Sequence, residues 1–91
     1  MAKVIVTMKI MPEGPSVDLG KIEDKAKAII TDFGGTIMSA EKQPVGFGIV
    51  AIHIKFNMDE SKGDMEPLEK MIASEQGIES VEVIAVSRAF G

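Results

Sequence analysis

The chain of 91 residues contains no cysteine, tryptophan or tyrosine, and a single histidine, His53. Without cysteine it cannot form disulfides, iron–sulfur clusters or thiolate zinc sites, and it has no cysteine nucleophile. One histidine argues against a histidine metal cluster and against a Ser–His–Asp triad. The composition therefore predicts no bound metal and no cofactor.

Positive charge is also scarce, because ten Lys and Arg residues face fourteen Asp and Glu residues and the net charge is −4. Binding along a nucleic-acid backbone needs clustered positive charge, so we expect no direct nucleic-acid partner. No run approaches the roughly 18 apolar residues of a membrane span, and no signal peptide precedes the first periodic segment. We expect a cytoplasmic protein without a membrane partner, monomeric when free.

Hydrophobic residues make up 45% of the chain and charged residues 26%, which is a globular mixture. The length suits one domain with one modest core, so residues 1–91 are expected to form a single domain. A deep cleft between two lobes is not expected in a chain of this size.

Hydrophobic periodicity predicts four strands and two helices. Apolar residues alternate with polar ones in residues 3–11 and 50–58, and weaker strand patterns cover residues 36–42 and 81–86. Apolar spacings of three and four predict a helix over residues 19–33, begun by Asp18 or Ser16 and ended by Gly34 and Gly35. A second helix follows Asp64, and its inner stripe is expected to be Met65, Leu68, Met71 and Ile72.

The resulting order is β-α-β-β-α-β. Two right-handed β-α-β crossovers can interleave so that each inserts a strand between the other's pair. This predicts an α+β fold, the ferredoxin-like plait, with a four-stranded antiparallel sheet in the order 4-1-3-2 and both helices on one face. The plait hosts many unrelated functions and by itself identifies none.

Several polar residues are candidates for functional sites. His53 falls on the strand face opposite the large apolar residues, where a solvent-facing role is favoured over ligand binding. Residues 57–82 hold eight acidic residues and two lysines, which could steer a basic partner or form a solvated helix face. Asp59, Glu60 and Asp64 lack the spacing of a calcium loop.

Residues 44–48, Pro-Val-Gly-Phe-Gly, are expected to form a turn, and they contain the most unusual local feature. Phe47 stands between Gly46 and Gly48, where burial of a large ring is difficult because turns lie at the surface. Two interpretations are open: the ring folds back onto the edge of the core, or it is a binding knob. Phe90, near the C-terminus, raises the same question.

Three segments carry a resemblance to a known family. They are residues 44–49, Pro-Val-Gly-Phe-Gly-Ile; residues 5–12, Ile-Val-Thr-Met-Lys-Ile-Met-Pro; and residues 78–85, Ile-Glu-Ser-Val-Glu-Val-Ile-Ala. They resemble the turn, the first strand and the last strand of the exchange domain of the translation elongation factor 1-beta family. The likeness covers nearly the whole chain, which is similar to the short archaeal form.

The resemblance implies a guanine nucleotide exchange factor that promotes GDP release and GTP loading on elongation factor 1-alpha, and not an enzyme in the covalent sense. It also implies that a basic residue after the last strand, here Arg88, reaches the Mg²⁺ and phosphate site of the GTPase. Eukaryotic members carry Lys at that position, followed by one residue, whereas three residues follow Arg88. The expected partner-binding residues are Pro44, Gly46, Phe47, Gly48 and Phe90.

In the predicted topology Phe47 precedes the third strand and Arg88 follows the fourth, and these strands run the same way. Strands of seven or eight residues, at about 3.3 Å each, would separate the two by roughly 25 Å. The protein should therefore bridge two regions of its partner. The main alternative is a small ligand-sensing or oligomerising ferredoxin-like regulatory domain that docks through the open sheet face.

Overall fold

A computed structural model describes residues 3–62 and 64–89 of the chain. Its elements, in chain order, are β1 (Lys3–Pro12), α1 (Leu19–Phe33), β2 (Thr36–Gly46), β3 (Ile49–Asp59), the 3-10 turn η1 (Glu60–Lys62), α2 (Glu66–Ala73) and β4 (Ile78–Ala89). The strands form one antiparallel sheet in the order β2-β3-β1-β4. This is the predicted plait, read from the opposite edge.

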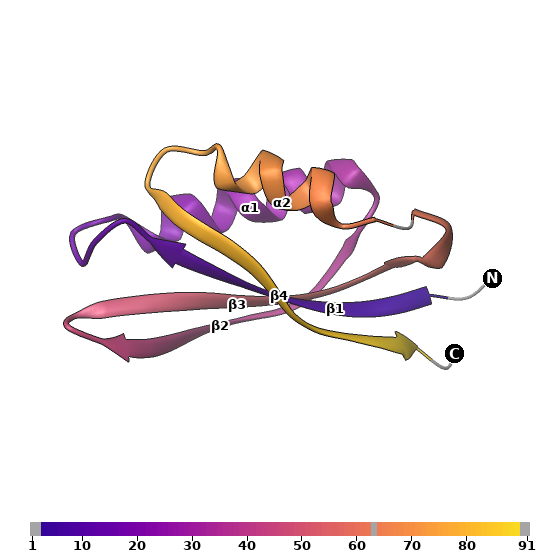
Figure 1. The fold of residues 1–91 in the computed structure, drawn as a ribbon, viewed down its shortest axis with the longest axis horizontal. Coiled ribbons are helices and arrows are strands. Elements are labelled where there is room, and N and C mark those ends of the chain that lie inside the picture. The colour runs from indigo at the N-terminus through magenta and orange to yellow at the C-terminus, as the bar shows by residue number, and fades with distance from the viewer. Residues whose placement is uncertain (1–2, 63, 90–91) are drawn as a thin grey trace.

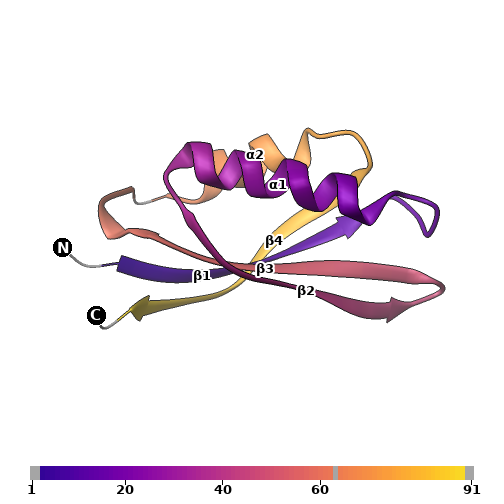
Figure 2. The ribbon, with the colours of Figure 1, turned by 180° about the vertical axis from the view of Figure 1, so that it is seen from behind.

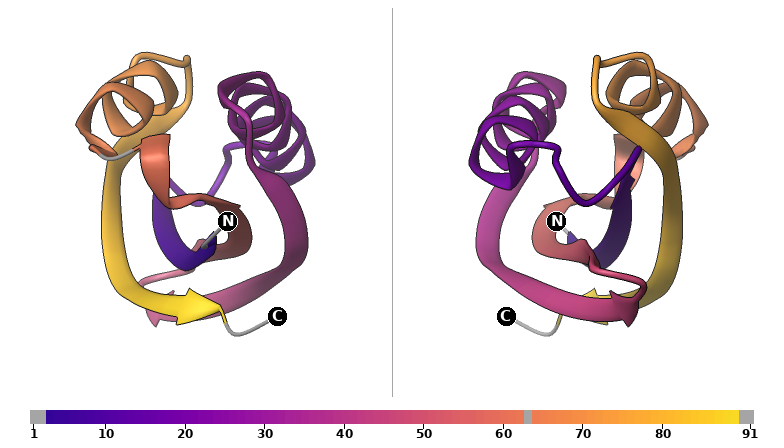
Figure 3. Two further views of the ribbon diagram at one scale, coloured as in Figure 1. Left: turned by 90° about the vertical axis from the view of Figure 1, so that its right-hand side faces the viewer. Right: turned by 90° about the vertical axis from the view of Figure 1, so that its left-hand side faces the viewer.

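Both helices lie on the same face of the sheet, side by side, as the end-on views of Figure 3 show. The other face carries no helix in the described part of the chain (Figure 2). Neither helix there is long and apolar enough to cross a membrane. The β2–β3 hairpin reaches past the helices at one end of the molecule, and the end of β4 lies at the other (Figure 1).

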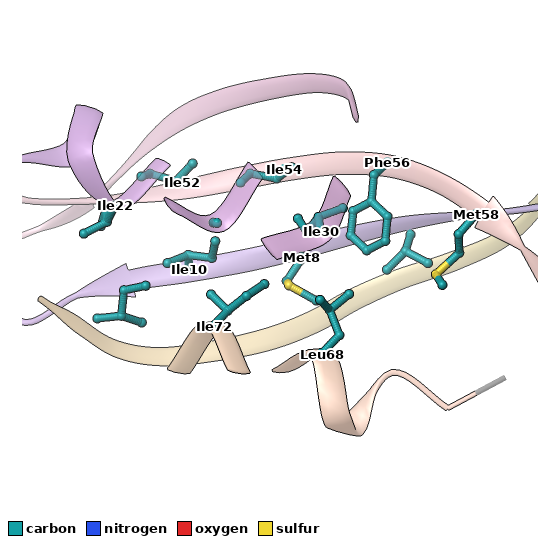
Figure 4. Packing of buried hydrophobic residues seen from close by; sticks show 13 residues of the cluster. Met8, Ile10, Ile22, Ile30, Ile52, Ile54, Phe56, Met58, Leu68 and Ile72 are labelled. Atoms are coloured by element: carbon teal, nitrogen blue, oxygen red, sulfur yellow. The ribbon is translucent and has the colours of Figure 1, made fainter. Parts of the chain in front are cut away.

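The core fills the space between the helices and the sheet (Figure 4). Alternate residues of β1 and β3 supply most of it, because a strand presents every second side chain to one face. Phe56 is its largest fully buried side chain. The fully buried residues include Val6, Met8 and Ile10 of β1, Ile52, Ile54 and Phe56 of β3, and Ile30, Leu68 and Ile72 of the helices.

Helix α1 begins and ends where its local sequence predicts. The Asp18 carboxylate accepts a hydrogen bond from the backbone N–H of Lys21, at 3.3 Å, as an N-cap. Gly34 ends the helix in the left-handed conformation, with φ of 111°. Gly35 is buried immediately afterwards, where a Cβ atom would lie only 2.7 Å from Cγ2 of Ile30.

Helix α2 differs from its predicted pattern at its start and along its inner stripe. The N-cap is Met65, which makes no side-chain cap hydrogen bond, and Asp64 precedes it and accepts a hydrogen bond from the N–H of Glu66 at 2.9 Å. Leu68 and Ile72 are buried, but Met71 is 43% exposed and does not belong to the inner stripe. An eight-residue helix makes little more than two turns, so it buries only a narrow line of side chains.

Two strands run further than the sequence patterns predicted. β2 continues past residue 42 to Gly46, and β4 continues past residue 86 to Ala89. Pro44 is tolerated within β2 because this strand lies at the edge of the sheet, where the missing N–H of proline does not deprive a neighbouring strand of a hydrogen-bond donor. These extensions decide where the candidate site residues lie.

Candidate partner-binding site

The turn between β2 and β3 presents Phe47 to solvent. Its side chain is fully exposed, so the interpretation in which the ring folds back onto the core is wrong. The turn itself consists of Phe47 and Gly48, with φ of 54° and 76°. Two successive central residues with positive φ are the mark of a type I′ turn, whose twist matches that of the strands it joins.

Phe47 is the only residue other than glycine with a positive φ in the described part of the chain. The left-handed region costs a side-chain-bearing residue about 1–2 kcal/mol, so this turn holds the ring against a local preference. Gly46, at φ of 110°, precedes it and has no atom within 4 Å of a Cβ position. The turn is therefore open on the side of Gly46.

The ladder of β2 with β3 fixes the position of this turn. Pro44 lies opposite Val50 and Gly46 opposite Ile49, with a shift in register at Val45 between them. Pro44, Gly46, Phe47 and Gly48 are all exposed, so the structure brings four of the expected partner-binding residues together on one hairpin. Phe90, the fifth, lies outside the described residues.

The loop from β1 to α1 lies against the same hairpin. A Cβ atom on Gly48 would approach Cβ of Pro15 to 3.5 Å, which is ordinary van der Waals contact. The backbone N–H of Glu13 in this loop donates to the carbonyl of Gly77, between α2 and β4, at 2.9 Å. The hairpin thus lies close to a loop that is itself hydrogen-bonded to the residue preceding β4.

Arg88 lies at the opposite end of the molecule and within a strand, not after it. β4 continues to Ala89 because the first residues of β1 offer it backbone partners, and Arg88 pairs with Val4. The expectation that the chain leaves the sheet before Arg88 is therefore wrong. Its Nη2 atom lies 3.2 Å from Oε2 of Glu60, and its side chain is 69% exposed.

The separation of Phe47 and Arg88 is larger than the sequence predicted. Val4 pairs with Arg88 on one side and with Met58 on the other, so Arg88 is level with the end of β3. The nine steps from Ile49 to Met58, at about 3.3 Å each, span roughly 30 Å. The predicted separation of about 25 Å rested on strands of seven or eight residues, whereas β3 has 11. The two residues thus lie toward opposite ends of a molecule 42 Å long.

Six of the eight acidic residues between 57 and 82 make a hydrogen bond or an ion pair within the chain. Asp59 accepts a hydrogen bond from the backbone N–H of Ser61 at 2.9 Å, and this bond lowers the pKa of Asp59 below its ordinary value of 3.8. Glu69 accepts from the N–H of Val83 at 3.2 Å and so ties α2 to β4. Among residues 3–62 and 64–89, no three His, Asp or Glu side chains are grouped closely enough to hold a metal.

The open face of the sheet carries a polar hollow lined by Thr7, Ser39, Glu41, His53 and Lys55. His53 is half-buried there, on the face opposite the core, as its place in the strand pattern predicted. Its cross-strand neighbours are Glu41 on β2 and Lys9 on β1. The only ring among these five side chains is the imidazole of His53, and no Phe lines the hollow.

The contact between Glu60 and Arg88 was not among the sequence-based predictions. Closeness in sequence groups Glu60 with Asp59 and Asp64 and with the other acidic residues between 57 and 82, and not with Arg88. The register would have suggested the contact, since β1 pairs on one side with the end of β3 and on the other with the end of β4. Glu60 directly follows β3, so the topology brings it toward Arg88.

The chain matches the model of the EF-1 guanine nucleotide exchange domain over residues 5–89. It is 36% identical to elongation factor 1-beta of Methanococcoides burtonii over 88 residues, covering 97% of this chain and 98% of that one. It is also 36% identical to elongation factor 1-beta of Methanocaldococcus jannaschii, covering 98% of this chain and 100% of that one.

Similar solved structures support the fold. The ACT domain from GTP pyrophosphokinase of Chlorobium tepidum superposes with a TM-score of 0.63 at 16% identity, covering 90% of this chain and 99% of that one. The C-terminal domain of the MgtC protein from Mycobacterium tuberculosis gives a TM-score of 0.54, also at 16% identity, over 98% and 88%. At this identity the likeness concerns the fold alone. The family match and the relatives of equal length together show that the chain belongs to the EF-1 guanine nucleotide exchange domain family and is a nucleotide exchange factor of translation elongation.

Proposed function

We propose that residues 1–91 act as a single exchange domain that promotes GDP release and GTP loading on elongation factor 1-alpha. A guanine nucleotide exchange domain acts on a GTPase, and the relatives are factors of the elongation factor 1 system. The proposal includes a cytoplasmic location and a monomeric free state. The exchange involves no covalent chemistry on the factor, so the chain is a catalyst of release and not an enzyme of bond cleavage.

The thermodynamic requirement on such a factor is simple. It must bind the nucleotide-free GTPase more tightly than the GDP-bound one, because only a difference in affinity shifts the equilibrium and lowers the barrier to release. A contact that is equally strong in both states holds the complex together without speeding release. The two ends of this molecule suit these two tasks.

The observation that carries the proposal is the full exposure of Phe47 on a constrained turn. An aromatic ring that buries no surface in the free protein gains all of its burial on binding, and aromatic residues dominate binding energy at protein interfaces. The turn holds the backbone in place, so little conformational entropy is lost when the ring enters a pocket. Phe47 therefore acts as an anchor for an apolar pocket of the GTPase.

Arg88, roughly 30 Å away along the sheet, acts at the nucleotide. A guanidinium is always charged and donates in a planar fork that matches phosphate and carboxylate oxygens. Placed at the Mg²⁺ and phosphate site of the GTPase, it competes with the ion for the same anionic ligands. This contact differs between the GDP-bound and nucleotide-free states, which is the condition for accelerating release.

Release of a fluorescent GDP analogue from purified elongation factor 1-alpha tests the proposal. The release rate should rise with the concentration of the factor and reach a plateau, because exchange passes through a complex. The matched control is Val45→Ala, which shortens a partly exposed side chain on the same hairpin and should leave the plateau unchanged. A release rate that stays at its intrinsic value when the two proteins form a complex would contradict the proposal.

Gel filtration separates this proposal from a ligand-sensing or oligomerising domain. A free exchange factor should elute as a monomer, with or without added amino acids or nucleotides. A shift to a larger species on addition of a small molecule would favour the regulatory alternative.

A further inference from the structure

The contact between Glu60 and Arg88 joins two elements that are far apart in sequence. Arg88 lies opposite Val4 in the ladder, and directly opposed residues place their side chains on the same face of a sheet. Val4 packs against the core, so Arg88 is on the helix-bearing face. Glu60 begins η1 directly after β3, and its carboxylate reaches Nη2 of Arg88 at 3.2 Å.

The backbone on the Glu60 side is held by its own hydrogen bond. The Asp59 carboxylate accepts from the N–H of Ser61 at 2.9 Å, which forms a closed local turn around Glu60. On the other side, Arg88 belongs to a strand that is paired with β1. Two fixed backbone positions therefore face each other across the start of β1, and the ion pair links their side chains.

This ion pair does little for the stability of the fold. The side chains of Arg88 and Glu60 are 69% and 42% exposed, and exposed pairs of this kind contribute little because water and salt screen them. The ion pair instead restricts the conformation of the Arg88 side chain. An arginine side chain has four rotatable bonds, and it loses rotational freedom where a partner holds it. A guanidinium has five N–H donors, and a contact through Nη2 alone cannot use them all.

We infer that Glu60 is a positioning residue for the exchange reaction. It holds the Arg88 guanidinium on the helix-bearing face at the end of the sheet, with donors left over for a second anion, a phosphate or carboxylate of the GTPase. Part of the entropy cost of ordering the Arg88 side chain is thus met before the complex forms. This favours the bound state in which Arg88 occupies the nucleotide site. This inference rests on the proposed function of Arg88.

The test is a double-mutant cycle in the assay of fluorescent GDP release, at saturating factor, with Glu60→Gln, Arg88→Ala and the double variant. Glu60→Gln should lower the plateau rate about two- to fivefold, the range that an exposed ion pair supplies. The half-saturating concentration should not change, because the anchor lies at the other end. In the Arg88→Ala background, Glu60→Gln should have no further effect.

The control variant is Glu66→Gln, which removes the same charge from another exposed ion pair, that of Glu66 with Lys70 at 3.1 Å. It should leave the plateau rate unchanged. Equal slowing by Glu60→Gln with and without Arg88 would overturn the inference, and so would a plateau equal to that of the wild type. Faster release by Glu60→Gln would also overturn it, because the carboxylate would then mask Arg88.

A second measurement does not depend on exchange. In the free wild-type protein, NMR relaxation of the Arg88 side-chain Nε–H should report restricted motion, and Glu60→Gln should release it. Unchanged motion would overturn the inference even if the wild type is an active factor. Failure of the wild type to accelerate GDP release would instead contradict the proposed function, and the NMR result would still show whether Glu60 holds the guanidinium.

Discussion

Replacing Phe47 should separate binding from stability more cleanly than any other substitution in this chain. The ring is fully exposed, so Phe47→Ala removes no packing from the core and keeps a side chain at the same left-handed φ of 54°. The free energy of unfolding should therefore change by less than about 0.5 kcal/mol, or about 2–4 °C in melting temperature. If the ring is the anchor, binding should weaken by about 2 kcal/mol, which is about 30-fold in Kd.

Phe47→Gly sharpens the test, because binding and stability should then move in opposite directions. Glycine removes the left-handed strain of about 1–2 kcal/mol and loses about 0.5–1 kcal/mol to its greater freedom in the unfolded chain. The variant should be at least as stable as the wild type and should bind as poorly as Phe47→Ala.

Thermal unfolding followed by circular dichroism gives the stabilities, and calorimetric titration against elongation factor 1-alpha gives Kd. Val45→Ala on the same hairpin is the control for loss of an exposed apolar side chain. A drop of many degrees in melting temperature for Phe47→Ala, with Kd unchanged, would refute the reasoning, because the ring would then serve the fold and not the partner.

Three further outcomes are expected. Arg88→Ala should slow GDP release at saturating factor with little change in Kd, whereas Arg88→Lys should keep much of the release rate. Stopped-flow release measures both variants, and a wild-type rate in Arg88→Ala would remove this residue from the mechanism. Gly35→Ala should destabilise the fold by about 1–3 kcal/mol in urea unfolding, because its Cβ would lie 2.7 Å from a methyl carbon of the buried core, while Gly14→Ala, with no atom within 4 Å, should be neutral. An NMR titration should give Asp59 a pKa below 3.8, because the N–H of Ser61 stabilises the ionised carboxylate. The resulting contribution to folding stability is present above pH 3.8 and is lost as the pH falls through the pKa of the folded protein. A measured pKa at or above 3.8 would contradict the hydrogen bond.

Local features of the chain were predictable where their cause is local. Asp18 and Gly34 bound α1 through contacts within four residues, so the residues themselves contain the information. The alternation in β1 and β3 likewise identifies which side chains face the core, since a strand has a period of two. The order of these elements is enough to predict the plait, because few topologies satisfy the handedness of two crossovers.

Strand ends were not predictable in the same way. The ends of β2 and β4 depend on how far a neighbouring strand offers backbone partners, which is a property of the register and not of the segment. Pro44 resembles a strand breaker until the edge position of β2 is known. Arg88 therefore seemed to follow the sheet, although it lies within β4.

By itself, the amino-acid sequence determined the elements, their order, the faces of the two central strands and the candidacy of Phe47, whereas Arg88 became a candidate through the family resemblance. The tertiary structure decided that the Phe47 ring is exposed, since whether a turn folds back depends on the hairpin's direction past the core. It also decided that Glu60 and Arg88 are neighbours, although 28 positions separate them in the chain. The physical reason is that each depends on strand register and sheet twist, which arise from pairing between distant segments and are absent from any local pattern.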